Sequence, residues 1–221
     1  MNALVFDNGD ILFDASRWRR WLAAYLAGHG TSITYEELVV RWEWHLESVY
    51  KGRREYWDAF HKLLSELGLE SHDISLTTEV ARSKAQKFSA SRRPMAGVPT
   101  TLKTLASLGI KLAVLSDTES GEAGVRVILK QLGIESCFDA VVSSADIGST
   151  KPEPAAYAAA IRALGVSASN CGFVGHDLDE LVGARQFGLV PIAFNHSSDV
   201  PADIYLDSFD QILTAVELRH E

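Results

Sequence analysis

The chain has 221 residues, a length that suits one large domain or a core domain with one insertion. It carries 29 acidic against 21 basic residues, and its net charge of -8 argues against a polyanionic partner such as nucleic acid. No apolar run approaches the roughly 18 residues of a membrane-spanning helix, and the N-terminus reaches an acid too early for a secretion signal, so we expect a soluble cytoplasmic protein.

The first predicted element is a short apolar strand that stops at a carboxylate. In the stretch LVFDNGDILFD, residues 4–14, the apolar run ends at Asp7 and an Asn-Gly turn follows. Such a run is typical of a buried parallel strand, and open α/β sheets bind their ligands at the carboxyl ends of such strands. Asp7 is therefore a candidate nucleophile, since a carboxylate can form a covalent intermediate. Its position alone is equally compatible with a cap for the next helix.

Residues 15–93 have the pattern of consecutive helices with no strand between them. Ser16 can cap the first helix, Thr34 and Glu37 form a capping box for the second, and the third and fourth cover about 54–67 and 76–89. Amphipathic helices joined by short links should pack as a small bundle. Residues 16–93 hold 13 basic and 10 acidic residues, against 8 and 19 elsewhere, so this segment differs from the rest of the chain.

From Pro94 onward, strands and helices alternate. Predicted strands cover 110–115, 138–142, 172–174 and 190–194, and predicted helices begin near Pro99, pass through 125–132, and cover 154–164 and 180–187. This alternation predicts an α/β fold with a parallel sheet and helices on both faces. Because the strand before Asp7 opens the series, the helical bundle is predicted to be an insertion after the first strand.

Three strand ends in the second half carry polar groups suited to chemistry. Ser116 follows the strand in VLSDT, and Lys151 precedes a helix in STKPEP. A serine here is often a turn former and a lysine beside proline often a solvated loop residue, yet both could bind an anionic oxygen. The third, FVGHDLDELVGARQFG (173–188), places four titratable residues within positions 176–180, more than helix capping needs.

In this order and spacing, the motifs resemble the haloacid dehalogenase-like (HAD) superfamily. FDNGDILFD is similar to its first motif, VLSDT to its second, STKPEPAAY to its lysine motif and VGHDLDELVGA to its acidic fourth motif. The resemblance implies a Rossmann-like parallel-sheet core of residues 1–14 and 94–221. It also implies an all-α cap of the C1 type, residues 15–93, that closes over Asp7 on a central strand.

The resemblance also assigns roles to the matching residues. Asp7 would be the nucleophile, Ser116 would hydrogen-bond the anionic group of a small-molecule substrate, and Lys151 would hold Asp7 and the transferred group. In the magnesium-dependent members, Mg²⁺ is held by the nucleophile, by the backbone carbonyl two residues on, here Gly9, and by a carboxylate of the fourth motif. The carboxylate candidates are Asp177 and Glu180, and Asp10 and Asp117 are predicted to contact the substrate.

Two positions depart from the phosphatase pattern. The phosphatases place a general acid two residues after the nucleophile, where this chain has Gly9, and losing such an acid typically costs roughly 10²- to 10⁴-fold in rate. Counting back from Gly183 puts His176 where the metal-binding aspartate normally stands. Asp177 replaces that aspartate only if the loop is shifted by one residue, and His176 becomes a candidate catalytic residue.

The 2-haloacid dehalogenases of the same superfamily lack the second aspartate, need no metal and use a cap arginine to receive the halide. Arg41 is our candidate for that arginine, although its pattern also fits a solvent-facing helix residue, and Tyr157 matches a tyrosine of those enzymes. This alternative explains Gly9 but not the acidic cluster. A catalytically impaired ligand-binding protein is a further alternative. We favour a Mg²⁺-dependent phosphatase acting on a small phosphate monoester, and the sequence leaves the substrate and the oligomeric state open.

Overall fold

The computed structural model describes residues 1–196 and 200–217. Its core is a six-stranded sheet in the order β3-β2-β1-β4-β5-β6, and every neighbouring pair is parallel. The strands are β1 (Ala3–Phe6), β2 (Lys111–Ser116), β3 (Ala140–Ser143), β4 (Cys171–Gly175), β5 (Val190–Phe194) and β6 (Ile204–Leu206). The first strand lies in the centre, with Phe6 opposite Val114 of β2 and Val174 of β4. The predicted α/β fold class is confirmed.

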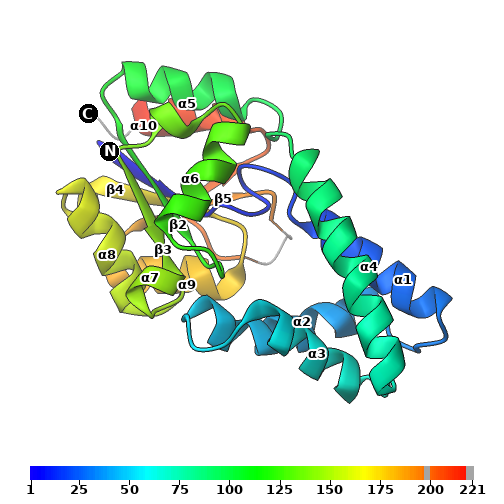
Figure 1. The fold of residues 1–221 in the computed structure, drawn as a ribbon. Coiled ribbons are helices and arrows are strands. Elements are labelled where there is room, and N and C mark those ends of the chain that lie inside the picture. The colour runs from blue at the N-terminus through cyan, green and yellow to red at the C-terminus, as the bar shows by residue number, and fades with distance from the viewer. Residues whose placement is uncertain (197–199, 218–221) are drawn as a thin grey trace.

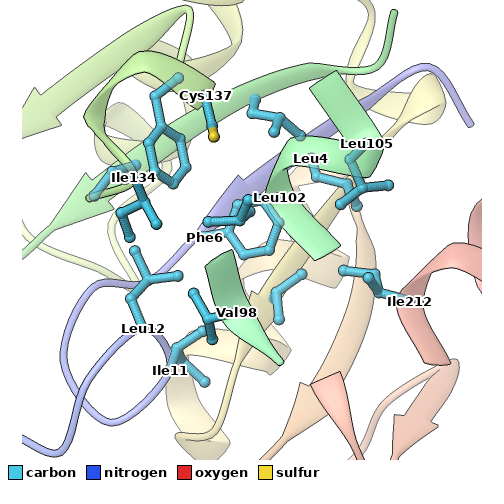
Figure 2. Packing of buried hydrophobic residues seen from close by; sticks show 14 of the residues in the cluster. Leu4, Phe6, Ile11, Leu12, Val98, Leu102, Leu105, Ile134, Cys137 and Ile212 are labelled. Atoms are coloured by element: carbon cyan, nitrogen blue, oxygen red, sulfur yellow. The ribbon is translucent and has the colours of Figure 1, made fainter. Parts of the chain in front are cut away.

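Helices cover both faces of this sheet (Figure 1). One face carries α5 (Val98–Ser107), α6 (Glu122–Gln131) and α10 (Ile212–Glu217), and the other carries α8 (Pro154–Leu164) and α9 (Leu178–Phe187). Leu4 and Phe6 point toward the first group, where Figure 2 shows them beside Leu102 and Leu105 of α5. Val5 is buried on the opposite face, so both faces of β1 are covered by helices. Every residue of the strand is therefore apolar, and its sequence is a continuous apolar run.

Four helices are inserted between β1 and the rest of the sheet, as predicted. They are α1 (Ser16–Gly28), α2 (Tyr35–Tyr50), α3 (Tyr56–Glu66) and α4 (Ser71–Ala90), and they lie to one side of the sheet (Figure 1). They share a hydrophobic core of their own that contains Leu22, Trp42 and Phe60. This arrangement is that of a helical cap, and the division at residues 14/15 and 93/94 stays a prediction.

The cap touches the core where α2 ends. Lys51 lies 2.8 Å from Glu153 of the core, and Gly52 adopts a φ of 66°. A Cβ at Gly52 would lie 3.1 Å from the carbonyl oxygen of Ala145 in the short helix α7 (Ser144–Ile147). A residue without a side chain therefore permits the close approach of cap and core.

Several element boundaries differ from the prediction. Ser16 does not cap α1; the carboxylates of Asp10 and Asp14 accept from the N–H groups at that end instead. Helix α4 begins at Ser71, five residues before its predicted start at about Leu76. The capping box of Thr34 and Glu37 is confirmed. The chain also contains β6, α7, α10 and 3₁₀ turns at Glu135–Cys137, Ala168–Asn170 and Phe209–Gln211, none of which was predicted.

Candidate active site

The polar residues after the predicted strands meet at one edge of the sheet. Asp7 directly follows β1 and its N–H donates to the carbonyl of Val174 at 2.9 Å. Ser116 is the last residue of β2, and His176 follows β4. Because parallel strands end on the same side, the topology brings together residues more than a hundred positions apart in the chain.

Lys151 is the charged centre of this cluster. Its side chain is 1% exposed, and its Nζ donates to Oδ1 of Asp7 and lies 3.2 Å from Oε1 of Glu180. Its backbone N–H donates to the carboxylate of Asp117 at 3.1 Å. Burial by itself would lower the pKa of Lys151, but the three carboxylates outweigh burial and hold the pKa well above its usual value. The lysine is therefore a permanent cation beside Asp7.

The carboxylates around Lys151 exceed its single positive charge. Burial raises the pKa of Glu180 well above its usual value, and Oε2 of Glu180 is buried with no hydrogen-bond partner among the described residues. Burial likewise raises the pKa of Asp117 to about 6. A further cation placed here would relieve both carboxylates.

Ser116 is 3% exposed and borders the cavity described below. Its Oγ accepts from Nδ2 of Asn8 at 3.3 Å, which leaves the hydroxyl proton of Ser116 free for an anionic oxygen. Asn8, the residue after Asp7, was not singled out in the sequence. Its contact with Ser116 spans two strands that only the fold brings together.

Asp10 links the core to the cap. One oxygen of Asp10 accepts from the N–H groups of Ala15 and Ser16 at 2.8 and 3.2 Å, and the other lies 2.8 Å from Arg19 of α1. Arg19 also lies 2.6 Å from Glu43 of α2. Asp10 adopts a φ of 58°, a conformation that aspartate tolerates better than most residues. Asp10 is therefore occupied as a helix cap and an ion-pair partner.

His176 and Asp177 occupy different places in the fourth motif. Nε2 of His176 lies 3.9 Å from Oδ2 of Asp7, on the side of the carboxylate away from Lys151. Asp177 is exposed and caps α9, with its Oδ1 accepting from the N–H groups of Asp179 and Glu180 at 2.9 and 3.2 Å. Asp179 is exposed as well.

Two predicted substrate-binding residues lie away from the site. Arg41 is exposed on α2 and is not among the described residues that line the cavity, because Trp42 and Glu43 present that face of the helix instead. Tyr157 is fully buried in the core, and its hydroxyl donates to the backbone carbonyl of Glu180 at 2.7 Å. Tyr157 therefore positions α9, and like Arg41 it is not among the described residues that line the cavity, so the substrate contacts of both stay predictions.

A cavity of about 1220 Å³ lies between the strand ends and the cap. Asp7, Ser116, Lys151 and His176 line its core side. Cap residues from α1, α2 and α4 line the opposite side, and Arg19 and Glu43 are among them. The cavity is therefore placed to hold a small molecule with one end against Asp7.

Comparison with known proteins agrees with this geometry. A family model described as haloacid dehalogenase-like hydrolase matches residues 1–188. The chain belongs to this family. It is 28% identical over 199 residues to a glyceraldehyde 3-phosphate phosphatase of Methanopyrus kandleri, an alignment that covers 87% of this chain and 83% of the relative.

Relatives with a different activity are also found in this hydrolase family. An (S)-2-haloacid dehalogenase of Pseudomonas sp. (strain YL) is 30% identical over 107 residues, 48% of this chain and 45% of that protein. The crystal structure of an L-2-haloacid dehalogenase of Xanthobacter autotrophicus with chloropropionic acid covalently bound has a TM-score of 0.68 at 20% identity, and the match covers 98% of both chains. The latter likeness is one of fold.

The oxygen donors at the strand ends suit a magnesium ion. Mg²⁺ is commonly bound through one or two carboxylates plus substrate phosphate and water, so it does not require a complete cage of protein ligands. Among the described residues, no group of three Asp, Glu, His or Cys side chains forms such a cage. The buried Oε2 of Glu180 is available as a metal ligand. Asp177 uses only its Oδ1 to cap α9, so its Oδ2 is available as well. The donor set therefore fits Mg²⁺ held together with a substrate phosphate.

Arg19 and Glu43 are the functional candidates that the sequence did not indicate. They come from different helices of the cap, 24 positions apart, and Asp10 joins them from the core.

No helix in the described part of the chain is long and apolar enough to cross a membrane.

Proposed function

We propose that this HAD-like hydrolase is a Mg²⁺-dependent phosphatase that acts on a small phosphate monoester through an aspartyl-phosphate at Asp7. The observation that carries the proposal is the excess of carboxylates around Lys151, among them Glu180, whose Oε2 has no hydrogen-bond partner among the described residues. A phosphoryl group and a divalent cation together suit such a site, whereas a halide gains nothing from added negative charge.

The contacts of Asp7 support a division of labour between its two oxygens. Lys151 holds Oδ1, so Oδ2 is the oxygen that attacks phosphorus. The bond from phosphorus to the ester oxygen then breaks, and the alcohol leaves with a proton. Water next attacks the phosphorus of the aspartyl-phosphate and releases inorganic phosphate, which regenerates the carboxylate.

The remaining residues bind charge and supply the proton. The hydroxyl of Ser116 and the ammonium of Lys151 hold the non-bridging phosphoryl oxygens. His176 is our proposed proton donor in place of Gly9, because its Nε2 lies 3.9 Å from the attacking oxygen. When bound by Asp7, the Gly9 carbonyl and a carboxylate of Asp177 or Glu180, Mg²⁺ would supply further neutralisation of phosphoryl charge.

The cavity lining gives little support to the dehalogenase alternative: Arg41, its candidate halide acceptor, is not among the described residues that line the cavity, and Arg19, one of the cap arginines that do line it, is already shared by two carboxylates. The test compares p-nitrophenyl phosphate, sugar phosphates and 2-chloropropionate as substrates, with Mg²⁺ and with EDTA. We expect metal-dependent phosphate release that Asp7→Asn abolishes in a folded protein. Halide release without metal, or phosphate release that survives Asp7→Asn, would contradict the proposal.

A further inference from the structure

Asn8 is a buried polar side chain that the proposed reaction leaves without a role. It directly follows Asp7, lines the cavity and is only 4% exposed. Its Nδ2 donates to Oγ of Ser116 at 3.3 Å, and its Oδ1 is buried with no hydrogen-bond partner among the described residues. An unsatisfied buried oxygen costs stability, so packing of the strand end alone does not explain an asparagine at this position.

The parallel register of β1 and β2 brings Asn8 and Ser116 together. Phe6 is opposite Val114 in the sheet. Asn8 and Ser116 each follow two residues later, and equal steps along two parallel strands keep residues side by side. The backbone of Asn8 is fixed as well, since its carbonyl accepts from the N–H of Leu12 at 3.0 Å. The sheet and the turn after β1 therefore hold the pair in one place.

The direction of this hydrogen bond decides what Ser116 offers to a substrate. A serine hydroxyl has one proton and two lone pairs. Because Nδ2 of Asn8 is a donor, it occupies a lone pair of Ser116 and leaves the hydroxyl proton for another acceptor. Within the described part of the chain, the side chain of Ser116 makes no other hydrogen bond. The oxygens of a phosphate dianion only accept, so they require the proton of Ser116 and are repelled by its lone pairs.

We infer that Asn8 is a positioning residue that acts through Ser116: its amide keeps the hydroxyl proton of Ser116 directed at the phosphoryl group bound against Asp7. The inference rests on the proposed phosphatase function and adds one residue to the site that binds the phosphoryl group. Asn8 itself takes no part in making or breaking bonds. An aspartate here would reverse the hydrogen bond, because an ionised carboxylate only accepts and Ser116 would then donate to it.

The test is a double-mutant cycle between Asn8→Asp and Ser116→Ala, with p-nitrophenyl phosphate and Mg²⁺. Asn8→Asp keeps the size of the side chain but adds a negative charge, which acts on the substrate whether or not Ser116 is present. The Ser116→Ala background measures that charge effect alone. We expect Asn8→Asp to lower kcat/KM at least about tenfold more with Ser116 present than with it absent, the effect of one hydrogen bond to a charged group.

Two further measurements separate positioning from a structural role. The part of the loss that depends on Ser116 should appear mainly in KM, because the hydroxyl bonds the phosphoryl oxygen both before and during transfer.

Asn8→Leu removes the donor without adding charge and carries the test if Asn8→Asp does not fold. Its Ser116 hydroxyl can rotate among three staggered positions, so we expect a smaller loss, roughly threefold, again only with Ser116 present. Asn2→Asp is the matched control. It makes the same change at an exposed position before β1, at the opposite end of that strand, and should leave kcat/KM unchanged.

Three outcomes would overturn the inference and leave the phosphatase function standing. An equal loss in both backgrounds would mean that Asn8 acts through charge or packing alone. A negligible effect of Ser116→Ala in the unmodified protein would mean that the hydroxyl proton is already committed to Asn8. A larger loss in Asn8→Leu than in Asn8→Asp would show that the direction of the hydrogen bond does not matter. Failure of the unmodified protein to hydrolyse p-nitrophenyl phosphate would overturn the proposed function as well.

Discussion

Replacing Lys151 with methionine should destabilise the protein far more than the same replacement of a surface lysine. Methionine keeps an unbranched side chain but removes the ammonium that lies between Asp7 and Glu180. Both carboxylates then remain buried without their cation. Removing one partner of a buried ion pair typically costs about 3–5 kcal/mol. In a protein of this size each kcal/mol lowers Tm by about 2–4 °C, so we expect a drop of about 6–20 °C near neutral pH.

The pH dependence of this loss identifies its cause. Burial already raises the pKa of Glu180, and without Lys151 its protonated form should be favoured further. A carboxyl group whose pKa is raised on folding destabilises the protein above that pKa, and the penalty disappears as pH falls toward the unfolded value of about 4. The difference in stability between Lys151→Met and the unmodified protein should therefore be larger at about pH 8 than at about pH 5.

Urea unfolding at both pH values measures this difference. Lys62→Met is the matched control, since Lys62 is 59% exposed and pairs with Glu66 at 3.3 Å on the surface of α3. Surface pairs of this kind contribute about 0.3–0.5 kcal/mol. A loss in Lys151→Met no larger than in Lys62→Met, or a loss that does not change with pH, would refute the reasoning from buried charge.

Three further predictions concern the metal, the proton donor and Asp117. Asp177→Ala should reduce the rise in Tm produced by Mg²⁺ far more than Asp179→Ala does. The readout is the shift in Tm on adding metal, because loss of the α9 cap in Asp177→Ala by itself costs about 1 kcal/mol of stability. Equal metal-induced shifts in the two variants would mean that Asp177 is not the ligand. Because His176 is our proposed proton donor, Gly9→Asp should leave the ratio of sugar-phosphate to p-nitrophenyl phosphate turnover nearly unchanged, although its Cβ would lie 3.1 Å from the side chain of Ala15, which must move slightly; a selective gain on sugar phosphates would show that the unmodified protein lacks a positioned acid. Because burial raises the pKa of Asp117 to about 6, Asp117→Asn should be more stable than the unmodified protein above pH 6 and lose that advantage as pH falls; an advantage independent of pH in urea melts would contradict this.

The sequence predicted most of the fold because its local signals agree with the global arrangement. Apolar runs bounded by glycine and proline coincide with the buried strands, and β5 and α8 have their predicted boundaries. The sixth strand was missed because Ile204–Leu206 is a three-residue edge strand, too short for a periodic pattern. The start of α4 was missed because its first turn, Ser71–Ile74, is largely polar and exposed.

The candidate site was predictable where residues follow strands, and not where they come from the cap. Asp7, Ser116 and His176 line the cavity because the ends of parallel strands share one edge, and Lys151 joins them from the loop before α8. Arg41 is not among the described residues that line the cavity, and the sequence could not show this, since a position on a helix fixes its face only once the packing of that helix is known. Arg19 lines the cavity instead, and the pairing that holds it there joins three separate segments.

A rapid-quench experiment tests the central claim, that Asp7 carries the phosphoryl group, most directly. The protein is mixed with p-nitrophenyl phosphate and Mg²⁺, stopped in acid within one turnover, and digested for mass spectrometry. We predict a peptide that carries one phosphoryl group on Asp7, formed at least as fast as steady-state turnover and lost on treatment with hydroxylamine. Phosphate release at full rate with no phosphoryl group on Asp7, or with the group on another residue, would contradict the account.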